Sequence, residues 1–130
     1  MRVLLDTHVW LWLQASPQRL DAKARELVQD TRNELLLSAA SAWEIAIKYA
    51  LGRLALPEPP PSYVPDRMAS SGVGGLAVEA GHALHVATLP ALHRDPFDRL
   101  LVAQSQLESI PIMTADSAIA RYDVAVVSPN

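Results

Sequence analysis

The stretch HRDPFDRLLVAQ, residues 93–104, indicates a helix start followed by an apolar stripe. Asp95 is a good N-cap, Pro96 suits the first helical position, and Asp98 falls at the third, where a carboxylate meets the positive end of a helix. The stripe predicts a helix to about Glu108 and consists of Phe97, Leu100, Leu101, Ala103 and Leu107. On a helical wheel Asp98 lies at the border of this stripe. Because desolvating a charge is costly, its carboxylate needs a partner, which can be a cap, a cation or a metal.

The length and composition of the chain predict one globular domain spanning residues 1–130. Of the 130 residues, 50% are hydrophobic, which argues against disorder. The net charge of −3 does not point to a nucleic-acid-binding protein, and the absence of cysteine excludes disulfides and thiolate metal sites. Asp6 and His8 interrupt the apolar N-terminal run, which argues against a signal peptide, and no run has the roughly 18 apolar residues of a membrane helix. We therefore expect a cytoplasmic protein.

Strands and helices are predicted to alternate along the chain. Apolar runs predict strands at residues 2–5, 34–38, 76–78, 110–114 and 124–127. Helices are predicted at residues 8–14, after a cap at Asp21, from 41 to a stop at Gly52, at 64–70 and at 79–88, with an extended connector at 56–61 and a turn at 72–75. This alternation favours an α/β fold with a mostly parallel sheet flanked by helices.

Four acids from distant parts of the sequence are expected to meet at one edge of this sheet. Asp6 follows the first strand and Asp116 follows the fourth, while Glu44 and Asp98 are expected in the first turns of helices that leave the same edge. Ligands of such sheets bind beyond the carboxyl ends of the strands. Four clustered carboxylates repel one another unless a cation joins them, and oxygen ligands favour Mg²⁺ or Mn²⁺. Such a centre is suited to phosphodiester hydrolysis.

Each acid also has a purely structural explanation. Asp6 and Asp116 can cap the helix or turn that follows, and Asp98 can simply interact with the helix dipole. Glu44 can form a capping box with Ser41. Capping does not exclude metal binding, because the same geometry points a carboxylate out of the strand edge. Only the conjunction of the four acids indicates a functional site.

The histidines and tryptophans give weaker signals. The histidines show no ligand spacing and are expected at the surface or hydrogen-bonded within the protein; they are His8, His82, His85 and His93. The tryptophans are expected in the core or at an interface; they are Trp10, Trp12 and Trp43.

Lys48 is the strongest candidate for a substrate contact. It lies one helical turn after Glu44, with which it can also form an i,i+4 ion pair. Arg99 points away from the acids on the helical wheel and is the weaker candidate. Thr7 and Thr114 are further predicted substrate contacts.

Four segments together resemble the PIN domain and, more narrowly, the VapC-type toxins of bacterial toxin–antitoxin pairs. The segments are VLLDTH at 3–8, SAWEIAIK at 41–48, HRDPFDRLLVAQ at 93–104 and TAD at 114–116. The resemblance covers essentially the whole chain. It implies a five-stranded parallel sheet and a metal-dependent endoribonuclease whose Mg²⁺ or Mn²⁺ site is formed by Asp6, Glu44, Asp98 and Asp116. It also implies an RNA substrate, a homodimer and inhibition by a small antitoxin from the same operon.

Two other functions compete with this one. An aspartyl-nucleophile phosphatase would also place Asp6 at the end of the first strand, but that chemistry needs a second acid two residues later, where His8 stands. An inactive relative would bind a partner without cleaving RNA. The apolar helices at 9–13 and 43–51 carry more apolar surface than a monomer of this size buries, which favours an oligomer with a bound inhibitor. A metal-dependent RNA cleavage assay separates the enzyme from the inactive binding protein.

Overall fold

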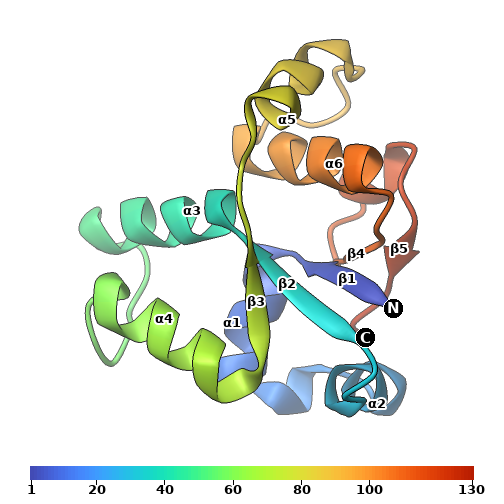
Figure 1. The fold of residues 1–130 in the computed structure, drawn as a ribbon. Coiled ribbons are helices and arrows are strands. Elements are labelled where there is room, and N and C mark those ends of the chain that lie inside the picture. The colour runs from blue at the N-terminus through green and yellow to red at the C-terminus, as the bar shows by residue number, and fades with distance from the viewer.

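The computed structural model describes all 130 residues and is built around a five-stranded sheet (Figure 1). The strands are β1 (Arg2–Leu5), β2 (Glu34–Ser38), β3 (Val73–Leu76), β4 (Ile112–Met113) and β5 (Val126–Val127). They lie in the order β3-β2-β1-β4-β5, and every neighbouring pair is parallel. The predicted α/β fold with a five-stranded, mostly parallel sheet is confirmed. Because the strands are parallel, their carboxyl ends meet at one edge of the sheet.

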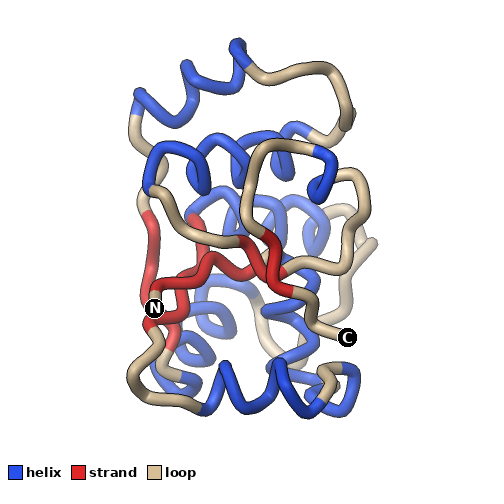
Figure 2. Tube along the Cα trace, turned by 90° about the vertical axis from the view of Figure 1, so that its right-hand side faces the viewer, coloured by secondary structure: helices blue, strands red, loops and turns tan.

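Helices cover both faces of the sheet (Figures 1 and 2). They are α1 (Thr7–Ala15), α2 (Ala22–Gln29), α3 (Ala39–Ala50), α4 (Pro60–Ser71), α5 (Ala80–His85) and α6 (Pro96–Glu108). Val3 and Leu5 of β1 belong to a core with α1, α2 and α4, whereas Leu4 belongs to a second core with α6. This alternation is the period of two expected of a strand buried on both faces. None of the helices is long and apolar enough to cross a membrane.

The start of α6 agrees with the sequence prediction. Asp95 caps the helix, since its Oδ1 accepts hydrogen bonds from the N–H groups of Phe97 at 2.9 Å and Asp98 at 3.3 Å. Pro96 is the first helical residue and Glu108 is the last. The cap places the Asp98 side chain in the first turn, beside the carboxyl ends of the strands.

The buried face of α6 is broader than predicted. Leu107 is 47% exposed, whereas Val102 and Gln104, which were not assigned to the apolar stripe, are buried. The reason is that α6 packs against the sheet on one side and against α5 on another. Arg99 points away from Asp98, as predicted, and its guanidinium donates hydrogen bonds to backbone carbonyls before the helix, at Val86, Leu89 and Pro90.

The third strand lies earlier than predicted. It is β3 (Val73–Leu76), so the segment 72–75 is largely a strand and not a turn. Pairing with β2 keeps Gly74 and Gly75 extended despite their low strand propensity. A Cβ atom at Gly74 would lie 3.4 Å from Leu36 Cδ2, so glycine permits close packing here. β4 and β5, with two residues each, are shorter than predicted.

Two helices also begin earlier than predicted. α4 begins at Pro60, inside the segment expected to be an extended connector, because proline is tolerated in a first turn, where its missing N–H has no helical acceptor. α3 begins at Ala39, and Ser38 caps it by accepting a hydrogen bond from the Ala40 N–H at 3.0 Å. The proposed capping box of Ser41 and Glu44 is therefore wrong, because both residues lie inside the helix.

Candidate active site

Asp6 connects the end of β1 to the start of α1. Its carboxylate accepts hydrogen bonds from the Thr7 N–H at 2.7 Å and from the Thr114 hydroxyl at 2.6 Å. The capping role weighed for Asp6 is thus confirmed, and the cap leaves the carboxylate at the end of the strand. Asp6 is only 2% exposed, and burial raises its pKa. Because Thr114 follows β4, this hydrogen bond joins the ends of two neighbouring strands.

Glu44 lies in the second turn of α3, not in the first as predicted. Its Oε1 accepts a hydrogen bond from the Thr7 hydroxyl at 2.8 Å, and its Oε2 accepts one from the Lys48 ammonium at 2.6 Å. Ser41 is also hydrogen-bonded to the Thr7 hydroxyl, at 2.8 Å. The predicted i,i+4 pair with Lys48 is confirmed, and this hydrogen bond raises the pKa of Lys48. Glu44 is therefore held at both carboxylate oxygens.

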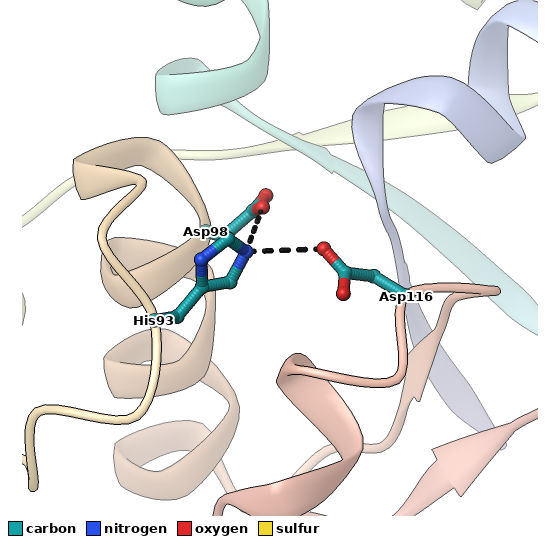
Figure 3. Close-up of side chains that lie close together, drawn as sticks. All are labelled: His93, Asp98 and Asp116. Carbon is teal, nitrogen blue, oxygen red and sulfur yellow. Dashed lines mark hydrogen bonds and ion pairs between the residues drawn. The ribbon is translucent and has the colours of Figure 1, made fainter.

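Asp98 and Asp116 meet at His93 (Figure 3). His93 Nε2 lies 2.9 Å from Asp98 Oδ2 and 3.0 Å from Asp116 Oδ2. Asp116 also caps the turn that follows it, since its Oδ1 accepts a hydrogen bond from the Ala118 N–H at 2.8 Å. One ligand atom from each of the three side chains in Figure 3 lies within 4.8 Å of the other two, close enough for all three to hold one metal ion.

Burial and mutual repulsion change the acidity of this cluster. Burial raises the pKa of Asp98 to about 8, and the charges of the nearby carboxylates add to the rise. Burial also opposes ionisation of Asp116, but hydrogen bonds from a backbone N–H and from His93 hold the pKa of Asp116 below its usual value. Neighbouring acids whose pKa values move in opposite directions are typical of functional sites.

A cavity of about 300 Å³ opens at this edge of the sheet. Asp6, Glu44 and Asp98 line it, and Asp116 lies beside it, linked to Asp98 through His93. The basic side chains of the lining are Lys48 and Arg53. The structure therefore brings together the four acids that the sequence pointed to, although they come from four separate segments of the chain.

Two histidines at the site had no role assigned from the sequence. His8 lines the cavity, and its Nδ1 lies 3.3 Å from Asp6 Oδ2. His93 contacts Asp98 and Asp116. Both were expected to be ordinary surface or hydrogen-bonded histidines, and the only signal for His93 was its position five residues before Asp98. The hydroxyls of Thr7 and Thr114 bond to carboxylates of the site, and their contact with substrate stays a prediction.

The donor set fits a hard divalent cation. Carboxylate oxygens are the ligands that Mg²⁺ and Mn²⁺ prefer, and the chain has no cysteine to favour a softer metal. Burial is the main cause of the raised pKa of Asp98, and the charges of the neighbouring carboxylates add to it, so the ionised acids repel one another. A cation among them would relieve this repulsion and allow every acid to ionise.

Fold and site together define a class of protein: an α/β domain with an acidic pocket, suited to a divalent cation, at the carboxyl ends of its parallel strands. The family model of the PIN domain matches residues 3–125, and the chain belongs to the PIN domain family. The resemblance seen in the four sequence segments is thereby confirmed.

Two proteins of Mycobacterium tuberculosis (strain ATCC 25618 / H37Rv) are similar in sequence. Ribonuclease VapC16 is 59% identical over 63 residues, which make up 48% of this chain and 45% of that protein, so this match spans about half of each. Ribonuclease VapC22 is 30% identical over 121 residues, which make up 92% of this chain and 91% of that protein.

Solved structures share the fold at low sequence identity. VapBC2 from Rickettsia felis, bound to a DNA fragment from its promoter, contains a chain with a TM-score of 0.71 and 14% identity, covering 98% of both chains. FitAcB from Neisseria gonorrhoeae contains one with a TM-score of 0.62 and 19% identity, covering 98% of this chain and 97% of the other. These similarities support the PIN fold.

Proposed function

We propose that this chain is a metal-dependent endoribonuclease that acts as the toxin of a toxin–antitoxin pair and inhibits translation and growth. The observation that carries the proposal is the acidic cavity, where Asp6, Glu44 and Asp98 converge with Asp116 beside them. The relatives named as ribonucleases support RNA as the substrate. The complexes named VapBC and FitAcB support a cognate antitoxin as the partner.

Asp6, Glu44, Asp98 and Asp116 would hold Mg²⁺ or Mn²⁺. When bound, such an ion supplies an activated water and neutralises charge on the phosphate. The protein's own contribution is orientation. Thr7 and Thr114 hold Glu44 and Asp6 by hydrogen bonds to their hydroxyls, and both hydroxyls are buried. Carboxylates fixed in this way need no rearrangement when the cation arrives.

A cytoplasmic homodimer is part of this proposal. α3 leaves two large apolar side chains exposed, Trp43 at 61% just before Glu44 and Leu51 at 62% just after the helix. Trp10, by contrast, is fully buried in the core, as predicted. Exposed apolar surface of this kind favours an interface with a second copy or with the antitoxin.

RNA cleavage with purified protein tests the proposal. We expect cleavage of single-stranded RNA in Mg²⁺ or Mn²⁺, complete loss in EDTA, and recovery when the cation is returned in excess. Cleavage that persists in EDTA would contradict the metal requirement. No cleavage of any RNA under these conditions would instead favour the inactive binding protein. Hydrolysis of a small phosphomonoester without cleavage of RNA would favour the phosphatase.

Lys48 is expected to contribute to RNA binding, because its side chain is 49% exposed at the wall of the acidic cavity. In a cleavage-deficient Asp98→Asn background, Lys48→Ala should weaken RNA binding by roughly 3- to 10-fold and reduce its salt dependence by about one phosphate contact. Fluorescence anisotropy at two salt concentrations measures both. Lys23→Ala is the matched control, since Lys23 is exposed on α2, away from the cavity. Equal losses in the two variants would show that Lys48 acts only through overall charge.

A further inference from the structure

We propose that His93 is a positioning residue of the metal centre: its Nε2 is hydrogen-bonded to Asp116, lies at ion-pair distance from Asp98, and so holds the two carboxylates together before a cation binds. The inference rests on the proposed metal-dependent function. It assigns a task to a side chain that the four-acid pattern leaves out.

Nε2 lies between the two carboxylates, hydrogen-bonded to Asp116 and in ion-pair contact with Asp98 (Figure 3). The distances to Asp98 Oδ2 and Asp116 Oδ2 are 2.9 Å and 3.0 Å. The two acids come from different elements, α6 and the segment after β4, and both carry negative charge when ionised. A hydrogen-bond donor between them offsets their repulsion. Asp98 Oδ1 accepts no hydrogen bond from the protein, so that oxygen stays available to a cation.

The other ring nitrogen determines which proton His93 carries. The Asp95 N–H donates to His93 Nδ1 at 3.3 Å, so Nδ1 offers its lone pair and the proton lies on Nε2. A His93 that bound a metal through Nε2 would need its proton on Nδ1, where it would face the Asp95 N–H. The same cap residue that starts α6 therefore selects the tautomer that donates to the carboxylates. In the observed arrangement Nε2 therefore faces the two carboxylates as a donor.

The backbone of His93 is also anchored. Its N–H donates to the Tyr122 hydroxyl at 3.0 Å, and the Arg99 guanidinium donates to the same hydroxyl at 3.0 Å. Tyr122 is buried, and Arg99 belongs to the helix that carries Asp98. The backbone of His93 is thus fixed relative to α6, and only 20% of the His93 side chain is exposed. A donor held this firmly can orient its acceptors, as the residues around a metal site characteristically do.

The proposal is tested by measuring the Mn²⁺ affinity of matched variants with isothermal titration calorimetry. This measurement needs no RNA. His93→Ala should weaken Mn²⁺ binding by about 10-fold or more. His93→Gln should recover most of the affinity, because its amide nitrogen is as many bonds from Cα as Nε2. His93→Asn, whose nitrogen corresponds to Nδ1, should not. His85→Ala is the control, since His85 is hydrogen-bonded to Gln106 away from the site. Circular dichroism melting establishes that each variant is folded.

The outcomes separate this inference from the function on which it rests. Wild-type affinity in His93→Ala would overturn the positioning role and leave the metal site intact. Wild-type protein that binds no Mn²⁺ would overturn both. Pulsed electron paramagnetic resonance of the Mn²⁺-loaded protein should show no directly bound nitrogen. A nitrogen coupling that disappears in His93→Gln would make His93 a ligand and refute the proposal.

Discussion

Asp98→Asn is expected to reduce RNA cleavage by at least about 100-fold while the protein stays folded. The substitution keeps the size of the side chain and its place in the first turn of α6, but it replaces a charged ligand by a weak one. Asp98 is buried, lines the acidic cavity and contacts His93, so the change acts at the centre of the site. Initial cleavage rates in saturating Mn²⁺, together with a melting curve, measure both parts of the expectation.

Asp95→Asn is the matched control for this experiment. Asp95 lies three residues earlier and also lines the cavity, yet its Oδ1 is occupied as the cap of α6. Asparagine is an equally good N-cap, so cleavage should change by less than about 3-fold. An Asp98→Asn protein that cleaves RNA like the wild type would leave Asp98 with a role at the helix end only.

The metal-free protein is expected to lose stability as the pH rises from about 4 to about 8. The pKa of Asp98 is about 8 in the folded state, against an ordinary value of 3.8, so the folded protein binds this proton more tightly than the unfolded chain. The stabilisation is complete below the unfolded pKa and is lost as the pH passes through the folded one. Burial raises the pKa of Asp6, which acts in the same direction. Asp116 has a lowered pKa and titrates below this window.

Melting temperatures in EDTA across this pH range measure the effect. Asp98→Asn should flatten the profile and raise the melting temperature at pH 8, because the uncharged amide removes both the cost of burying a charge and the repulsion by the neighbouring acids. Excess Mn²⁺ should raise the wild-type melting temperature at pH 8 by about 5 to 10 °C, and should raise that of Asp98→Asn much less. A wild-type profile in EDTA that rises toward pH 8 would show that neither burial nor the neighbouring acids oppose ionisation of Asp98 in the folded state.

Local chemistry accounts for the elements that the sequence predicted well. The start of α6 was predictable because Asp95, Pro96 and Asp98 each satisfy a requirement of a helix N-terminus within four residues. The position of β3 was not predictable in this way, because Gly74 and Gly75 favour a turn locally and form a strand only through pairing with β2. Where tertiary pairing opposes local preference, as in β3, the residues themselves carry little signal.

The candidate site was also predictable only where local sequence determines the position of a residue. Asp6 and Asp116 were found because acids that directly follow predicted parallel strands must lie at one edge of the sheet. The role of His93 could not be found in this way, because one of its partners is 23 residues away and the bond depends on how two loops pack. RNA as the substrate and the antitoxin as the partner came from the family resemblance. The net charge of −3 by itself argued against a nucleic-acid-binding protein.

The position of β1 between β2 and β4 determines when the site can exist during synthesis. The hydrogen bond from Thr114 to Asp6 joins residues 108 positions apart, and Asp116 comes later still. A ribosome making this chain has therefore placed the first acid in the emerging polypeptide long before the last one is added. The nascent chain holds an unfinished site until the segment that carries Thr114 and Asp116 has left the exit tunnel. The order of strands thus makes the acidic site depend on the pairing of β1 with β4, whose residues are synthesised more than 100 positions later.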